Sequence, residues 1–154
     1  MISHQELSDR MEIQNILALY CEAIDNRDWE ALDNFFTEDA IIDYTATGGL
    51  KCTLPEAKEY LDRALKQFNG GQHMIGVPLI NFNGDEAKTR TILFNPMIVE
   101  REGQPHVFFV GAWYVDEFVR TDKGWRIRHR NEECSYFHNP VSYTHLTLPT
   151  RLMV

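Results

Sequence analysis

Two residues far apart in the sequence, Asp25 and His73, have the side chains needed for acid–base chemistry. A carboxylate that accepts a hydrogen bond from one imidazole nitrogen selects the tautomer and leaves the other nitrogen free as a base. The same carboxylate raises the basicity of the ring. We therefore expect proton abstraction by a His–Asp dyad if the fold brings these two residues together.

Asp25 lies near the end of an apolar helical segment that also carries a phenol, Tyr20. Five positions separate the two by about 140° on an ideal helix, so they share a face only if the helix frays near Asp25. The following Asn-Arg-Asp sequence favours such a turn, and a carboxylate is unfavourable at a helix C-terminus. A residue placed against local preference indicates function. The alternative is that Asp25 caps the next turn or pairs with Arg27.

His73 follows the Gly70-Gly71 break and begins the apolar segment 73–80. A polar side chain that points from such a segment into the core needs a partner, and Asp25 is a candidate. The alternative is a core histidine with satisfied hydrogen bonds and no catalytic role.

Further candidates lie on the predicted strands. His129 and Asn131 have the same parity as Trp125 and Ile127, so we expect them to face the interior. Arg126, Arg128 and Arg130 have the opposite parity and are expected on a solvated face, although a bulge would reverse this for Arg130. The aromatic residues of the strands have core spacing, and some are expected to line a cavity. The residues expected to contact a substrate are Tyr44, Phe94, Trp113, His129 and Asn131.

The order of elements predicts an α+β fold, with helices first and strands second. Apolar spacing predicts a helix over 7–24 with Ser8 as a cap, a short helix over 29–36, a strand over 38–46 and a helix over 53–68. From residue 73 onward the period changes to two, with turn signals at Asn83-Gly84, Gly103 and Lys123-Gly124. A meander of about four antiparallel strands is the simplest reading.

Composition excludes several classes of function. The net charge of −8 over 154 residues argues against nucleic acid or anionic lipid as a partner. The N-terminus has no signal-peptide pattern and no apolar run is long enough to span a membrane, so we expect a cytoplasmic protein. Three cysteines without CxxC spacing predict free thiols, and no HxH, HExxH or nucleotide-binding motif occurs, so we expect no metal and no cofactor.

The segment 141–154 follows the predicted meander and resembles translated adapter sequence, so we interpret it as a tail that is not native. The alternative is a C-terminal arm that packs on a neighbouring subunit. An apolar outer sheet face predicts a homo-oligomer, a dimer or a trimer.

Three stretches resemble the SnoaL-like branch of the nuclear transport factor 2-like superfamily: residues 8–43, the sequence QHMIGV at 72–77, and residues 111–130. The resemblance implies one domain over 1–140 with a cystatin-like α+β cone, in which N-terminal helices pack on a curved antiparallel sheet and enclose a pocket. Dehydratases of this family place a Tyr, an Asp and a His as Tyr20, Asp25 and His73 are placed here.

The resemblance therefore implies a cofactor-independent dehydratase that acts on a hydroxylated, carbonyl-bearing cyclic or polycyclic small molecule. His73 would abstract the proton, Asp25 would support the imidazole, and Tyr20 would donate a hydrogen bond to the enolate or the leaving hydroxyl. The second catalytic histidine of scytalone dehydratase is absent from the later strands, and Asp116 replaces the aspartate of a ketosteroid isomerase only if it faces inward. The alternatives are an isomerase or polyketide cyclase on the same scaffold, or a non-catalytic small-ligand-binding domain.

Overall fold

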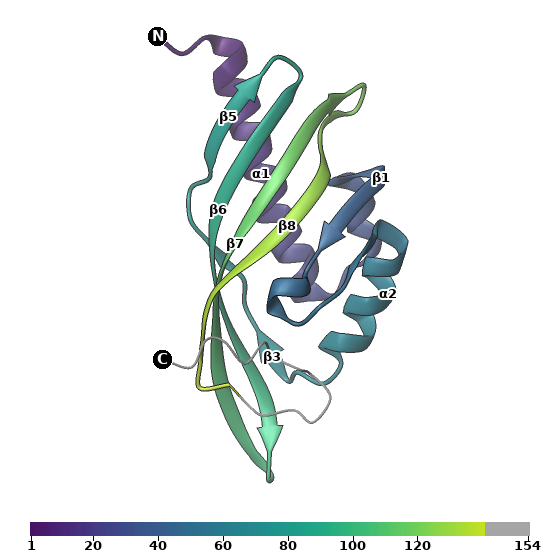
Figure 1. Ribbon diagram of the computed structural model, residues 1–154, viewed down its shortest axis with the longest axis vertical. Coiled ribbons are helices and arrows are strands. Elements are labelled where there is room, and N and C mark those ends of the chain that lie inside the picture. The colour runs from purple at the N-terminus through teal and green to yellow at the C-terminus, as the bar shows by residue number, and fades with distance from the viewer. Residues whose placement is uncertain (141–154) are drawn as a thin grey trace.

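The computed structural model describes residues 1–140, and it confirms the predicted α+β class. Helices pack on a large twisted sheet, with α1 lying across one face of the strands and α2 beside β1 (Figure 1). The helical segments of the described chain are α1 (His4–Asn26), η1 (Glu30–Asn34), η2 (Thr45–Thr47) and α2 (Leu54–Leu65). The strands are β1 (Phe36–Asp43), β2 (Lys51–Thr53), β3 (Gly70–Gly71), β4 (Met74–Ile75), β5 (Leu79–Asn83), β6 (Glu86–Arg101), β7 (Gln104–Thr121) and β8 (Gly124–His138).

Helix α1 is longer than its apolar spacing predicted. It begins at His4 because the Ser3 hydroxyl accepts from the Glu6 backbone N–H at 3.0 Å, so Ser3 caps the helix and the prediction of Ser8 is wrong. It continues through Asn26, so the predicted break at Asp25 is also wrong. Arg27 ends the helix in the left-handed conformation, with φ 58°. Asp25 therefore occupies the last turn of a regular helix.

The later helices are shorter than predicted. The segment expected as a helix over 29–36 forms only the 3-10 turn η1, because Phe36 already pairs with Ile127 as the first residue of β1. Helix α2 begins with a capping box between Thr53 and Glu56, in which each side chain satisfies the other residue's backbone N–H.

The described strands form one sheet in the order β2-β1-β8-β7-β6-β3, with β4 and β5 also paired to β6. The four-strand meander is confirmed as β5 to β8, each antiparallel to the next. The sheet as a whole is mixed rather than antiparallel, because β1 pairs in parallel with β8. Gly76 to Pro78 interrupts the first predicted strand, and His73 lies directly before the short β4.

A bulge in β8 decides which side chains face the helices. Glu117 pairs with His129 and Phe118 pairs with Ile127, so Arg128 is the extra residue. The side chains that follow the bulge therefore point to the face opposite to the one that strict alternation predicts. Arg130 is consequently fully buried, whereas the face expected for His129 is wrong.

Helix α1 is attached to the sheet by the carboxylate of Asp9, which is 5% exposed. Arg120 donates two hydrogen bonds to it, at 2.9 and 2.7 Å, and the indole N–H of Trp125 donates a third at 3.1 Å. The hydrogen bonds from Arg120 are the main reason that the pKa of Asp9 is lowered to about 2.

We expect Asp9→Asn to lower the free energy of unfolding by about 1–3 kcal/mol at pH 7, because it removes the charge that Arg120 binds. The folded-state pKa lies below the ordinary value of 3.8, so the wild-type advantage is complete above pH 4 and is lost as the pH falls toward 2. Urea unfolding at several pH values measures both effects. Asp85→Asn is the matched control, because Asp85 binds the same arginine at an 81% exposed position and should cost less than about 1 kcal/mol. A pH-independent deficit in Asp9→Asn would contradict this account.

The outer face of the sheet exposes several large apolar side chains, among them Ile92 (50%) and Tyr136 (46%). The predicted homo-oligomer remains a prediction.

Within residues 1–140, no helix is long and apolar enough to cross a membrane. The segment 141–154, interpreted above as a tail, lies outside the described residues.

Candidate active site

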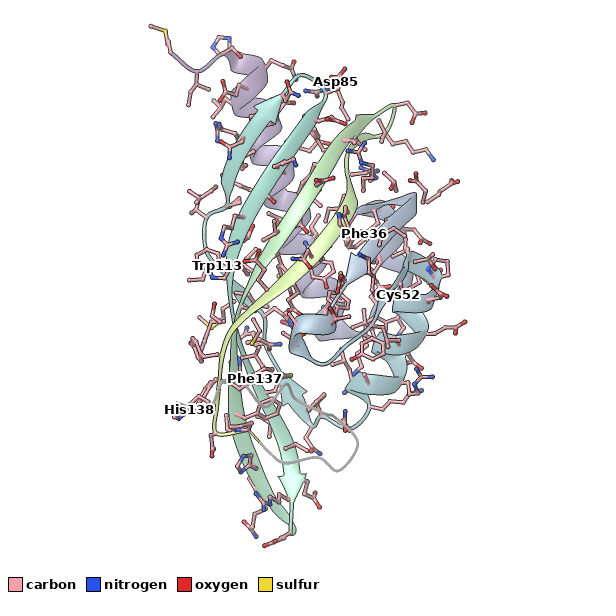
Figure 2. All side chains as sticks on the ribbon, viewed as in Figure 1. Phe36, Cys52, Asp85, Trp113, Phe137 and His138 are labelled. Carbon is pink, nitrogen blue, oxygen red and sulfur yellow. The ribbon has the colours of Figure 1, made fainter. Side chains whose placement is uncertain are left out.

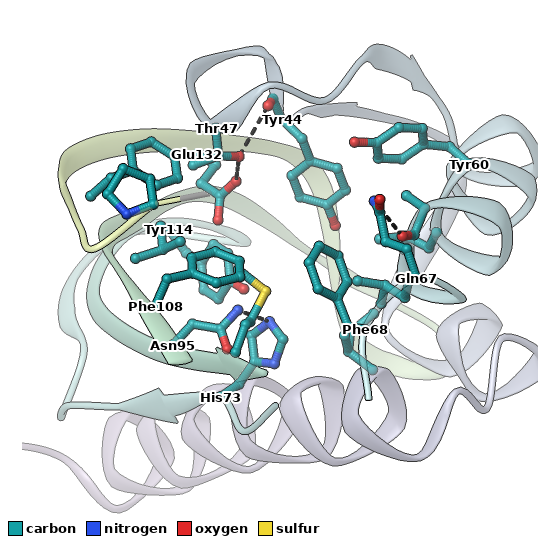
Figure 3. Close-up of a pocket in the computed structure, with 18 of the residues that line it drawn as sticks. Tyr44, Thr47, Tyr60, Gln67, Phe68, His73, Asn95, Phe108, Tyr114 and Glu132 are labelled. Atoms are coloured by element: carbon teal, nitrogen blue, oxygen red, sulfur yellow. Dashed lines mark hydrogen bonds between the residues drawn. The ribbon is translucent and has the colours of Figure 1, made fainter. Parts of the chain in front are cut away.

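A cavity of about 160 Å³ lies between the helices and the inner face of the sheet (Figure 3). An engineered apolar cavity of about 150 Å³ binds benzene, so this space holds one six-membered ring, and the cavity is partly open to solvent. The wall is largely apolar, with polar side chains at a few positions. Those polar residues are Tyr20, Tyr44, Thr47, Tyr60, Gln67, His73, Asn95, Tyr114 and Glu132.

His73 and Asp25 meet at one side of this cavity. Asp25 Oδ1 lies 2.6 Å from His73 Nδ1, and the carboxylate also accepts from the His73 backbone N–H, at 3.0 Å to Oδ2. The side chain of His73 is 13% exposed and that of Asp25 is 24% exposed. The carboxylate therefore orients both the backbone and the ring of His73, and it favours the tautomer with the proton on Nδ1.

The end of α1 is tied to the segment that follows α2. The Arg27 guanidinium donates to the carbonyl oxygens of Leu65 at 3.0 Å and Phe68 at 2.9 Å. Arg27 is thus occupied with backbone carbonyls, while Asp25 binds His73. The alternative assignment, an Asp25–Arg27 pair, is wrong.

Asn95 on β6 contacts the other nitrogen of His73. Its Nδ2 lies 3.3 Å from His73 Nε2, and in this orientation the amide donates to a neutral imidazole. Rotating the amide by 180° places its nitrogen 3.2 Å from the Gln72 carbonyl and turns its oxygen toward Nε2. One side chain can therefore serve both protonation states of His73. Asn95 was missed in the sequence, although it is a polar residue with the parity of the buried Leu93.

Two phenols form the next part of the wall. The hydroxyls of Tyr20 and Tyr44 are 2.7 Å apart, and both residues are buried. Burial is the largest cause that raises the pKa of each phenol, so both remain neutral donors. One hydroxyl donates to the other, which leaves one phenolic proton available to a ligand.

A buried ion pair lies against the ring of Tyr20. Arg130 donates to Asp116 at 2.7 and 2.8 Å, and both side chains are 0% exposed. The guanidinium lies against two rings, 4.0 Å from the Tyr20 centroid and 4.1 Å from that of Tyr114. Asp116 does face inward, but Arg130 occupies its carboxylate.

Four of the residues expected to contact a substrate lie outside the cavity wall: Phe94, Trp113, His129 and Asn131. Phe94 and Trp113 alternate with the inward-facing Asn95 and Tyr114, and in Figure 2 Trp113 lies on the side of the molecule opposite α2. These strands have apolar side chains on both faces, so periodicity alone did not distinguish inside from outside. For His129 and Asn131 the bulge at Arg128 explains the error.

The charges of the side chains that line the cavity limit which ligands it can bind. Among the described residues of its wall there is no lysine or arginine. Within residues 1–140, no group of three or more His, Cys, Asp or Glu side chains is placed to hold a metal ion. The wall therefore suits an uncharged molecule with a few oxygen atoms.

A family model described as the SnoaL-like domain matches residues 5–131. The uncharacterized protein Rv2910c of Mycobacterium tuberculosis is 46% identical over 132 residues, which cover 86% of this chain and 89% of that protein.

Solved structures of low sequence identity show the same fold. A Novosphingobium aromaticivorans protein provisionally named a scytalone dehydratase has TM-score 0.78 and 19% identity, covering 92% of this chain and 94% of its own. A hexachlorocyclohexane dehydrochlorinase from Novosphingobium barchaimii has TM-score 0.76 and 18% identity, covering 89% and 93%. A nuclear transport factor 2-like protein from Salmonella enterica has TM-score 0.69 and 18% identity, covering 84% and 92%.

Proposed function

The chain belongs to the SnoaL-like domain family, and from this premise we propose that it is a cofactor-independent dehydratase. Its substrate is an uncharged, hydroxylated, carbonyl-bearing cyclic or polycyclic small molecule. The observation that carries the proposal is the 2.6 Å contact between Asp25 and His73 at the wall of a cavity that also holds two neutral phenols.

In the proposed reaction His73 Nε2 removes a proton from the carbon next to the substrate carbonyl. Asp25 keeps the other proton on Nδ1 and stabilises the imidazolium that forms. The free phenolic proton of the Tyr20–Tyr44 pair hydrogen-bonds to the carbonyl oxygen as it becomes an enolate. The hydroxyl on the next carbon then takes up a proton within the site and leaves as water, and the carbon–carbon double bond forms. Two of the solved proteins with this fold carry names that denote elimination, one of water and one of hydrogen chloride.

Two probes of suitable size test the proposal. The cyclic β-hydroxy ketone 3-hydroxycyclohexanone loses water to give cyclohexenone, and 3-hydroxy-1-tetralone loses water to give 1-naphthol. We expect the wild-type protein to accelerate at least one of these reactions, with a product lighter by one water in the mass spectrum.

His73→Gln should abolish that acceleration, whereas His106→Gln should retain it because His106 is not part of the cavity wall. A product of unchanged mass would instead identify an isomerase or a cyclase. Binding of both probes without turnover, retained in His73→Gln, would identify a non-catalytic binding domain.

A further inference from the structure

Glu132 on β8 is a buried acid that the reaction described above does not use. It is 8% exposed and lines the cavity, at the side opposite His73 and Asn95 in Figure 3. It pairs across the sheet with Tyr114, and it follows Arg130 by two positions on the same face. The positive charge of Arg130 is already matched by Asp116 at 0% exposure, so Glu132 has no counterion of its own among the described residues.

The contacts of the Thr47 hydroxyl leave room for Glu132 to donate a proton. The Thr47 hydroxyl contacts Glu132 Oε2 and also lies 3.1 Å from the carbonyl oxygen of Tyr44. A hydroxyl has one proton and a carbonyl oxygen can only accept, so both hydrogen bonds form at once only if Glu132 supplies a proton. Burial acts in the same direction, since it raises the pKa of this carboxyl above its ordinary value.

The same arrangement can stabilise the carboxylate after the proton has left. The Tyr44 carbonyl also accepts from the backbone N–H groups of Thr47 at 3.1 Å and Gly49 at 2.9 Å, so it does not depend on the Thr47 hydroxyl. That hydroxyl can rotate and donate to Oε2 instead. Burial without a counterion favours the neutral form of Glu132, and its conjugate base gains a hydrogen-bond donor, which is the behaviour required of a general acid.

We propose that Glu132 is the general acid of the site, which protonates the leaving hydroxyl while His73 acts as the base on the other side of the substrate. This inference rests on the proposed dehydratase function. In the step, the C–H bond breaks and its proton goes to His73 Nε2, while its electron pair forms the carbon–carbon double bond. The C–O bond breaks on the next carbon, and the leaving oxygen takes the proton of Glu132 and departs as water. The imidazolium returns a proton to the Glu132 carboxylate through solvent, which restores both groups.

The choice of leaving group separates a general acid from a structural residue. The probes are 3-hydroxycyclohexanone, whose hydroxyl leaves slowly unless an acid protonates it, and 3-acetoxycyclohexanone, whose acetate leaves readily without a proton. We expect Glu132→Gln to lower kcat for the hydroxy ketone about 10²-fold or more and kcat for the acetoxy ketone less than tenfold. Glu133→Gln is the matched control, because the neighbouring Glu133 binds Arg90 at 2.7 Å on the outer face. It should leave both rates unchanged.

Equal losses on the two probes in Glu132→Gln would overturn the general-acid role while leaving the dehydratase in place. No turnover of either probe by the wild-type protein would remove the dehydratase, and this role with it. A second measurement uses only the wild-type protein, so it does not depend on whether a variant folds. The infrared spectrum at pH 7 should contain the carbonyl band of a protonated carboxyl group. Absence of that band would overturn the proposal.

Discussion

Asp25→Asn should lower kcat/KM for the dehydrated probe by about 10²–10⁴-fold while leaving the fold unchanged. The aspartate carboxylate accepts hydrogen bonds from both the backbone N–H and the ring Nδ1 of His73. An asparagine keeps the size of the side chain, but its neutral amide cannot stabilise an imidazolium. Where its nitrogen faces Nδ1 it also selects the tautomer that has the proton on Nε2, which is the nitrogen required as the base.

Initial rates and denaturation curves of the two proteins test this prediction together. Glu22→Gln provides the matched control, because it removes a carboxylate from an exposed position of the same helix. Its rate and stability should equal those of the wild type. Turnover in Asp25→Asn within threefold of the wild type would remove the dyad from the mechanism.

Asp116→Ala should lower the free energy of unfolding by about 3–5 kcal/mol, the largest effect on stability that we expect. Asp116 provides the two hydrogen bonds and the negative charge that balance Arg130, and both side chains are fully buried. Without Asp116 the guanidinium remains in an aromatic environment with no counterion. Because Arg130 also lies against the rings of Tyr20 and Tyr114, the cavity wall should loosen as well.

Urea unfolding at pH 7 measures the cost. Glu117→Ala removes the next carboxylate of β7, which is 35% exposed and binds Lys88 on the opposite face, and it should cost less than about 1 kcal/mol. The double variant Asp116→Leu with Arg130→Met replaces both charges by apolar side chains and should recover most of the lost stability. A cost below 1 kcal/mol in Asp116→Ala would show that the ion pair is not what holds this part of the core.

Both buried acids of β7 and β8 show the limit of reasoning from strand periodicity. Asp116 was considered only on condition that it faces inward, and Glu132 was not considered at all. A polar residue on the buried face of a strand is a signal that alternation can reveal, as it does for Asn95 between Leu93 and Met97. In β8 that signal was lost, because the extra residue Arg128 shifts the parity of the positions from His129 to Cys134.

The sequence by itself determined the α+β class and the positions of the main turns, and the family resemblance added the expectation that Asp25 meets His73. The class and the turns depend on local properties, namely helical spacing and Gly turns. Only the tertiary structure decided that β1 pairs in parallel with β8, that a bulge turns Arg130 and Glu132 inward, and that Phe94 and Trp113 face outward. These features depend on contacts between segments far apart in the chain. A single inserted residue or a change of strand partner alters them without changing the local pattern of side chains.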